Sequence, residues 1–209
     1  MNEERPRRIG ALLFPGFELL DIFGPLEMFS GLIMWSEAEI AVVAEQAGPV
    51  PSAQGPESVA TFGFADCPPL DLLLVPGGDG TREQAENPAL MSFLRETYPN
   101  LELLASICTG AGLLAAAGLL DGRRATTNKQ VFGWPVSQGP RTEWVPAARW
   151  VEDGNVVTAS GVAAGMDMAL RLVERLAGTE MAQRTAEYTE YEWHRDSTWD
   201  PFARRAGLA

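Results

Sequence analysis

The sequence predicts an α/β fold built on a doubly wound, mostly parallel β-sheet. Short apolar runs alternate along the chain with segments of helical pattern, which is the order expected of βαβ units. Several apolar runs are hydrophobic at nearly every position over five or six residues, as is typical of strands buried on both faces of a parallel sheet. The chain has 209 residues, a length that fits one domain, and we expect a single domain over 1–209.

In the first half of the chain, turn residues separate the predicted elements. These elements are a strand at 8–14, a helix at 21–32, a strand at 39–45, a strand at 71–78 and a helix within 81–99. The first strand stops at Pro15-Gly16. The first helix carries Pro25 in its first turn, where the missing N–H costs little. The second helix is expected to begin near Asn87-Pro88, where apolar residues first recur at helical spacing.

The second half repeats the alternation and ends in two helices. Its predicted elements are a strand at 101–107, a small-residue helix at 109–118, short strands at 123–127 and 155–160, and helices at 163–178 and 179–194. The helix at 163–178 is amphipathic and ends at a glycine, and Thr179 is the expected N-cap of the last helix. The tail, 187–209, is rich in aromatic and acidic residues, and is expected to roof a pocket, contact a partner subunit or lie on the surface.

Composition narrows the class of protein. The net charge of −12 and the pI near 4.5 argue against nucleic acid or an anionic membrane as a partner. No run of about 18 apolar residues is evident, so we expect no membrane-spanning helix. The start, MNEERPRRIG, is too charged for a signal peptide, and we expect a cytoplasmic protein. Cys67 and Cys108 are then expected to be free thiols, and no ligand spacing indicates a metal site.

Cys108 lies where the fourth predicted strand meets the following helix. The strand ends at Ile107, and Thr109-Gly110 opens a run of small residues. Such a sharp turn holds its residue in a strained conformation, with the side chain pointing out beyond the sheet. The helix N-terminus favours the thiolate, the nucleophilic form. We therefore expect an exposed, ionised nucleophile; the alternative is a cysteine that packs inertly. Cys67 has no such context and is expected to be an ordinary loop cysteine.

Two other strand ends carry residues that suit chemistry beside a thiolate. In doubly wound sheets, sites gather beyond the carboxyl ends of the strands. After the third strand, Gly77 and Gly78 offer backbone N–H groups that could stabilise a developing negative charge, unless they only form a turn. After the first strand, Asp21 is expected to exchange a proton with Cys108, unless it only caps the helix.

Four stretches of the sequence resemble the ThiJ/PfpI superfamily over nearly the whole length. They are GALLFPGFELLDIFGPLEMF, FADCPPLDLLLVPGG, ASICTGAGLLAAAGLLDGRRATT and DGNVVTASGVAAGMDMALRLVERLAG. The resemblance implies a flavodoxin-like sandwich of the class I glutamine amidotransferase type, a cysteine nucleophile on an elbow, a nearby acid and a homodimer. Since this superfamily hosts several chemistries, the fold alone does not define the reaction.

Local features are similar to the isocyanide hydratase subgroup of that superfamily. Aspartate stands at position 21, where the superfamily usually has glutamate, and Thr109 stands where protease-like members have histidine. Carried over by position, Cys108 is the nucleophile, Asp21 the general acid/base, and Thr109 a hydroxyl and amide donor. The implied reaction hydrates an isocyanide to an N-substituted formamide through a thioimidate on Cys108, with no metal or organic cofactor.

The sequence departs from the family pattern just after RRATT. Many relatives, isocyanide hydratases included, have a histidine there, and this chain has Asn128, which we assign to substrate binding together with Gly77 and Gly78. The lone histidine, His194, would reach the site only if the tail folds over it. The missing histidine disfavours glyoxalase-like and protease-like reactions.

The substrate is expected to be a small molecule with a hydrophobic substituent. Aromatic residues are candidates for an apolar pocket around it, unless they fill the core or a dimer contact; they are Phe17, Phe23, Phe132 and Trp134. Two alternatives stay open. One is another cysteine enzyme on this scaffold, glyoxalase-like or amide-hydrolysing. The other is a non-enzymatic redox or ligand sensor, a role that suits an exposed thiol of low pKa.

Overall fold

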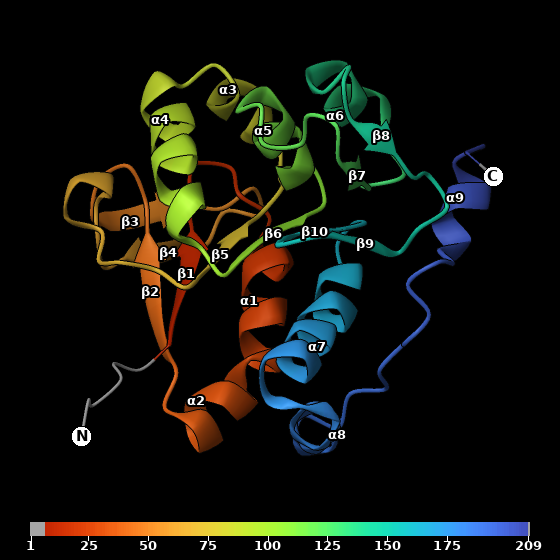
Figure 1. The fold of residues 1–209 in the computed structure, drawn as a ribbon. Coiled ribbons are helices and arrows are strands. Elements are labelled where there is room, and N and C mark those ends of the chain that lie inside the picture. The colour runs from red at the N-terminus through yellow and green to blue at the C-terminus, as the bar shows by residue number, and fades with distance from the viewer. Residues whose placement is uncertain (1–6, 209) are drawn as a thin grey trace.

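A six-stranded sheet in the order β2-β1-β5-β6-β10-β9 lies at the centre of the molecule (Figure 1). The computed structural model describes residues 7–208. The strands of the sheet are β1 (Arg8–Leu12), β2 (Glu39–Val43), β5 (Leu72–Val75), β6 (Leu103–Ile107), β9 (Trp150–Asp153) and β10 (Val156–Ala159). β9 pairs antiparallel with β10, and the other pairs are parallel. The predicted doubly wound, mostly parallel α/β sheet is confirmed.

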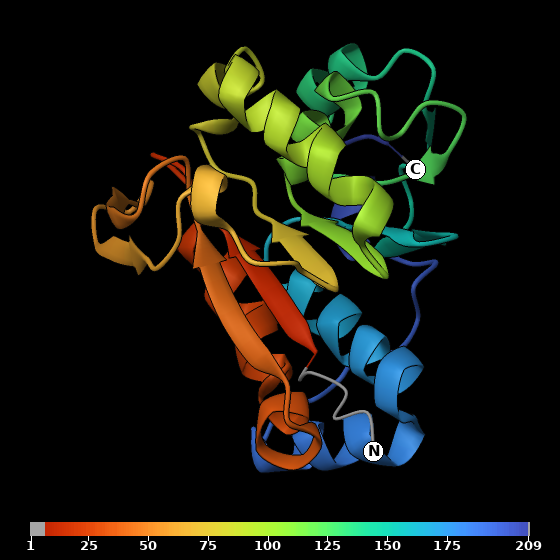
Figure 2. The same ribbon diagram turned by 60° about the vertical axis from the view of Figure 1, so that its left-hand side comes forward.

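Helices cover both faces of this sheet, as Figures 1 and 2 show. One face carries α1 (Leu19–Met28), α2 (Ser30–Ser36), α7 (Ala164–Ala177) and α8 (Thr179–Tyr188). The other carries α3 (Thr81–Gln84), α4 (Pro88–Thr97), α5 (Gly110–Ala116) and α6 (Gly133–Gln138). The short helix α9 (Pro201–Arg205) lies beyond the β9 edge.

Smaller elements connect these layers. Two two-stranded sheets pair β3 (Gly48–Pro51) with β4 (Glu57–Ala60), and β7 (Arg124–Ala125) with β8 (Glu143–Trp144). Two single 3₁₀ turns are η1 (Phe64–Asp66) and η2 (Tyr98–Asn100). β3 and β4 follow β2 and lie at the edge of the molecule (Figure 2).

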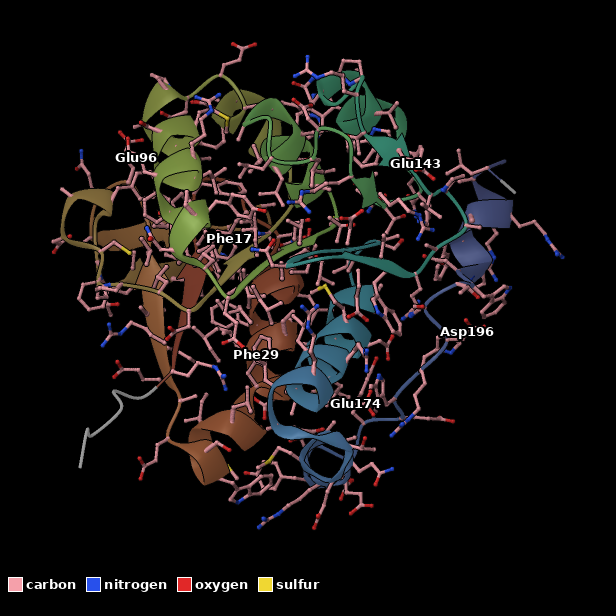
Figure 3. All side chains as sticks on the ribbon, viewed as in Figure 1. Phe17, Phe29, Glu96, Glu143, Glu174 and Asp196 are labelled. Carbon is pink, nitrogen blue, oxygen red and sulfur yellow. The ribbon has the colours of Figure 1, made fainter. Side chains whose placement is uncertain are left out.

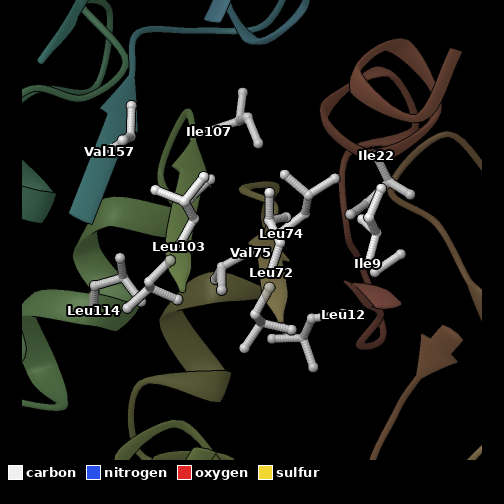
Figure 4. Packing of buried hydrophobic residues seen from close by; sticks show 14 of the residues in the cluster. Ile9, Leu12, Ile22, Leu72, Leu74, Val75, Leu103, Ile107, Leu114 and Val157 are labelled. Atoms are coloured by element: carbon white, nitrogen blue, oxygen red, sulfur yellow. The ribbon is translucent and has the colours of Figure 1, made fainter. Parts of the chain in front are cut away.

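Burial on both faces explains why the central strands are apolar throughout. Every residue of β5 and β6 is buried. Figure 4 shows Leu72 and Leu103 of these strands among the buried side chains of the core, together with Ile22 of α1 on one face of the sheet and Leu114 of α5 on the other. This packing fixes the carboxyl ends of β1, β5 and β6, from which the candidate site residues project.

The first predicted helix differs from the one observed. It begins at Leu19, two residues earlier than expected, so Pro25 lies inside α1 and not in its first turn. A proline inside a helix removes one hydrogen bond and crowds the preceding turn. Here α1 ends three residues later, at Met28, and α2 begins after Phe29.

The combined stretch Leu19–Ser36 is, by length and composition only, apolar enough to cross a membrane. Its mean hydropathy is 1.2, and 44% of it is buried inside the fold. We expected no membrane-spanning helix, since no run of about 18 apolar residues is evident. The mean hydropathy of this window is high even though Asp21 and Glu27 lie within it. Residues 1–6, on which the expectation about a signal peptide partly rests, lie outside the described residues.

The other helix boundaries are partly as predicted. Asn87 caps α4, where its side chain accepts hydrogen bonds from the N–H groups of Ala89 and Leu90, as expected. Thr179 is the first residue of α8 and does not cap it; Gly178 stands at the N-cap. α8 ends at Tyr188, six residues before the predicted end, and the chain continues as a loop to α9.

Candidate active site

Cys108 occupies the tight turn between β6 and α5, where the sequence placed it. Its φ of 55° lies in the left-handed region, which costs a non-glycine residue about 1–2 kcal/mol. The surrounding backbone holds this conformation. The Cys108 N–H lies 3.2 Å from the Ala159 carbonyl and 3.1 Å from the Ser160 carbonyl, and the Cys108 carbonyl accepts from Thr127 Oγ1 at 2.7 Å. The strained turn expected for a nucleophile is therefore present.

Gly110, two residues after the sulfur, makes this turn possible. A Cβ at this position would lie 2.4 Å from the Val75 carbonyl oxygen and 2.7 Å from that of Pro76. Both contacts are with backbone atoms at the end of the neighbouring strand β5, which cannot move aside as a flexible side chain can.

We expect Gly110→Ala to destabilise the protein by about 2–3 kcal/mol, because the overpacking exceeds the ~1 kcal/mol gain in helix propensity. Urea unfolding measures the change as a lower midpoint with an unchanged slope. Gly133→Ala is the matched control, since a Cβ there has no neighbour within 4 Å; it should be neutral or slightly stabilising. Equal midpoints for Gly110→Ala and the parent would contradict the close approach.

Asp21 is a fully buried carboxylate in the first turn of α1. It does not cap the helix, whose N-cap is Glu18. Its Oδ2 accepts from the Gly77 N–H at 2.8 Å, and its Oδ1 has no partner of hydrogen-bond geometry within residues 7–208. Burial raises the pKa of Asp21 well above its usual value, and the hydrogen bond from Gly77 opposes this. The charge of Glu18 raises the pKa further, and an interaction with the Cys108 thiol lowers it.

The protonation state of Cys108 differs from the sequence expectation. Only 6% of the residue is exposed. Burial raises the pKa of the Cys108 thiol to about 12, and the charge of Asp21 adds to the shift. Hydrogen bonds from Asn128 and Thr109 lower it without offsetting the rise. The expected exposed thiolate is therefore wrong. The loss of hydration raises the pKa of the Cys108 thiol by more than the partial positive charge at the N-terminus of the seven-residue helix α5 lowers it.

Gly77 and Gly78 lie beside the cysteine, but their N–H groups are engaged within the protein. Gly77 donates to Asp21, and Gly78 donates to Thr109 Oγ1 at 3.0 Å. A Cβ on Gly77 would lie 2.9 Å from Cys108 Cβ. The two amides thus fix Asp21 and Thr109 against the elbow, and they are not the free donors that we expected for a developing charge.

Asn128 is the side chain that the structure brings directly to the sulfur. Its Nδ2 donates to Cys108 Sγ at 3.1 Å, and its Oδ1 accepts from the backbone N–H groups of Gln130 and Val131 at 2.8 and 3.3 Å. Since backbone N–H groups only donate, they require the oxygen on their side and the amide N–H on the sulfur side. A Cβ on Gly161 would lie 2.2 Å from Nδ2, so this glycine leaves the room that Asn128 needs.

A cavity of about 260 Å³ opens onto Cys108. Its described lining contains Glu18, Ala53, Gln54, Gly78, Asp79, Arg82, Cys108, Thr109, Asn128, Gln130, Val131 and Val162. The four aromatic candidates are absent from this lining. Phe17 is buried near the centre of the molecule (Figure 3), and Phe23 is 47% exposed on α1. Phe132 packs edge-on against Trp144, and Trp134 lies under Arg82. These four residues therefore do not form an apolar pocket at this cavity, and Phe17 fills the core, which is the alternative that the sequence left open.

His194 belongs to a different part of the molecule. Its backbone N–H donates to Asp167 Oδ1 at 2.8 Å, and its ring packs against Trp199. Buried Asp167 also forms an ion pair with Arg149 and accepts from the hydroxyl of Tyr191. These contacts fasten the tail to α7, and Figure 3 shows Asp196 farther along it, on the outside of the molecule.

The tail then returns to the neighbourhood of the site. Phe202 of α9 lines a second cavity of about 240 Å³ together with Asn128 and Lys129. The Lys129 amino group is buried and donates to Thr126 Oγ1 and to the Ala148 carbonyl. Both cysteines are free, as predicted. Cys67 is half-buried and packs against the core, as expected of an ordinary loop cysteine.

The fold and the site together define an α/β domain with a cysteine on a strained strand–helix turn beside a buried carboxylate. The chain belongs to the DJ-1/PfpI family, whose family model matches residues 7–175. It is 37% identical to the isonitrile hydratase of Pseudomonas putida over 185 residues, which are 88% of this chain and 78% of that protein. The predicted membership of the ThiJ/PfpI superfamily is confirmed.

Other relatives show how diverse this family is. The chain is 32% identical over 186 residues to the HTH-type transcriptional regulator CdhR of Pseudomonas aeruginosa, covering 84% of this chain and 52% of the regulator. Among solved structures, a ThiJ/PfpI family protein from Pseudomonas syringae superposes with a TM-score of 0.81 at 31% identity. The match covers all of this chain and 88% of that one, and it supports the flavodoxin-like fold. Family membership alone therefore does not fix the activity.

Proposed function

We propose that this protein is an isocyanide hydratase that converts R–N≡C to the formamide R–NH–CHO. The observation that carries the proposal is the buried Asp21–Cys108 pair, in which one carboxylate oxygen is left without a partner beside a thiol that opens onto a cavity. The 37% identity to an isonitrile hydratase supports the same reaction.

In the first half-reaction, the Cys108 sulfur forms a bond to the terminal isocyanide carbon. Asp21 Oδ1 takes the thiol proton as the C–S bond forms and delivers it to that carbon, giving the thioimidate R–N=CH–S–Cys108. Burial raises the pKa of Asp21 well above its usual value, which makes this carboxyl group a better proton acceptor and carrier than an exposed aspartate. The Asn128 amide and the Thr109 N–H, which lower the pKa of Cys108, stabilise negative charge on the sulfur during the attack.

In the second half-reaction, a water molecule adds to the thioimidate carbon. One water proton moves to nitrogen, and the hydroxyl oxygen stays on carbon, which gives R–NH–CH(OH)–S–Cys108. Asp21 then removes the hydroxyl proton, the C–S bond breaks, and the proton returns to the sulfur. The products are the formamide and the original thiol, so one water is consumed and no redox step is needed.

The site favours this reaction over the two alternatives. A redox sensor needs a thiol that ionises easily and is accessible, and here burial raises the pKa of the Cys108 thiol to about 12. Protease-like members of the family are expected to carry histidine directly after the nucleophile, where this chain has Thr109, whose hydroxyl accepts from the Gly78 N–H. The proposal also includes a cytoplasmic homodimer that uses no cofactor; Leu20 and Phe23 on α1 expose apolar surface for a contact between copies.

The direct test is formamide production by the purified protein from a panel of small isocyanides, followed by NMR. In water labelled with ¹⁸O, the formamide carbonyl should carry one labelled oxygen. Methylglyoxal and simple amides serve as comparison substrates. Turnover of methylglyoxal or an amide with no formamide from any isocyanide would reject the proposal in favour of the first alternative.

A further inference from the structure

The cavity above Cys108 is lined largely by polar groups, which bears on the kind of substrate it accepts. Six of its lining residues carry charged or amide side chains; they are Glu18, Gln54, Asp79, Arg82, Asn128 and Gln130. Its aliphatic side chains are small, such as Ala53 and Val131. A bare hydrocarbon substituent would strip water from these groups without replacing their hydrogen bonds, which disfavours binding.

Arg82 is the cation among these lining residues, and it is held in place by stacking. Its guanidinium carbon lies 5.0 Å from the centroid of the Trp134 ring. Trp134 in turn packs so closely on α5 that a Cβ on Gly112 would lie 2.4 Å from its ring. Stacking on a fixed ring reduces the rotamer freedom that an arginine loses when it binds a ligand.

The guanidinium of Arg82 has no carboxylate partner in the part of the chain that the structure describes. Two carboxylates share its cavity. Glu18 Oε1 accepts from Gln54 Nε2 at 2.6 Å, and Asp79 is exposed at the rim. Neither pairs with Arg82, so its planar fork of N–H groups remains available to a ligand. Such a fork matches a carboxylate, which it can bind through two parallel hydrogen bonds.

We propose that Arg82 is a specificity-determining residue that binds a carboxylate on the substrate, so that the preferred substrates are small anionic isocyanides. This inference rests on the proposed function for the identity of the reacting group. The position of the anion follows from the cavity alone: Arg82 and Cys108 line the same space of about 260 Å³, which suits a short spacer between carboxylate and reacting carbon.

One experiment tests the anion site without any isocyanide chemistry. Iodoacetate and iodoacetamide alkylate a cysteine by the same displacement of iodide and differ in charge. The rate at Cys108 with each reagent is followed by mass spectrometry of its peptide, with Cys67 as the internal reference. We expect the iodoacetate-to-iodoacetamide ratio at Cys108 to fall about five-fold in Arg82→Met, as for a partly exposed charge pair.

Arg184→Met is the matched control, because Arg184 also stacks on a tryptophan, with its guanidinium carbon 3.8 Å from the Trp35 ring centroid. It lies on α8, outside the cavity lining, and its ratio should equal that of the parent. An unchanged ratio in Arg82→Met would overturn the proposal. So would an equal fall at Cys108 and at Cys67, since that would report a change in overall charge only.

Turnover separates this proposal from the function on which it rests. The parent is expected to hydrate isocyanoacetate with a kcat/KM at least about five-fold above that of its methyl ester, and Arg82→Met should remove the difference. Equal values for acid and ester in the parent would overturn the role of Arg82 and leave the hydratase intact. A lower alkylation ratio in Arg82→Met, with no hydration of either compound, would reject the hydratase and retain the anion site.

Discussion

Cys108→Ala is expected to lower kcat/KM for isocyanide hydration by at least about a thousandfold, because it removes the atom that forms the covalent intermediate. Substitutions of nucleophiles that act together with a proton carrier cost this much or more, since the remaining groups have nothing to activate. The loss should appear in kcat, because the cavity lining that binds the substrate is otherwise unchanged.

Two further variants make the result specific to this sulfur. Cys67→Ala should keep full activity, because Cys67 lies in a different region and packs against the core. Cys108→Gly should be inactive but at least as stable as Cys108→Ala, since glycine adopts the observed φ of 55° without strain. Formamide production and thermal unfolding measure the two effects separately. Substantial turnover by Cys108→Ala would rule out covalent catalysis by this thiol.

Asp21→Asn is expected to abolish most of the activity while stabilising the folded protein at neutral and alkaline pH. General acid–base catalysis contributes about 10²–10⁴-fold to a rate, so a loss in that range is expected. Because burial raises the pKa of Asp21 in the folded state, the folded protein binds this proton more tightly than the unfolded chain does. That stabilisation is complete below the usual carboxyl pKa and is lost as the pH rises through the raised folded-state pKa.

At pH values above the folded-state pKa of Asp21, the parent must bury an ionised carboxylate. The amide of the Asp21→Asn variant stays neutral, and its carbonyl oxygen can still accept from the Gly77 N–H. Removing an unfavourable group that is kept for function, such as this buried charge, typically increases the free energy of unfolding by about 1 kcal/mol. Thermal unfolding from pH 5 to 9 should show the variant gaining on the parent as the pH rises. Glu27→Gln is the control, because it removes an exposed carboxylate from the same helix. The difference in stability between this variant and the parent should not change with pH in this way. A parallel pH profile for Asp21→Asn and the parent would contradict the raised pKa.

Local sequence signals were sufficient for the parts of the fold that repeat a simple pattern. The buried strands β5 and β6 are continuous apolar runs, and small residues directly after a strand indicate the turn at Cys108. Elements of mixed composition gave no comparable signal. β3 contains two prolines among its four residues, and β9 ends in two acids, so neither shows the uniform burial pattern of a central strand.

The sequence predicted which residues meet at the site better than it predicted their protonation states. Cys108, Asp21 and Asn128 all lie at the elbow, but their protonation depends on burial by segments that are distant in sequence. The amides of Gly77 and Gly78 are taken by Asp21 and Thr109, which are 56 and 31 residues away along the chain. No short motif reports that such a donor is already used, or that Trp134 supports Arg82 and does not line the cavity.

The return of the chain from Asp167 to α9 places Phe202 in the lining of the second cavity, beside Asn128. Proteolytic cleavage in the loop between Tyr188 and Pro201 would separate α9, with Phe202, from the part of the chain that precedes the cut. The central sheet and the elbow would keep their own contacts, while the second cavity, beside Asn128, would lose the side that Phe202 forms.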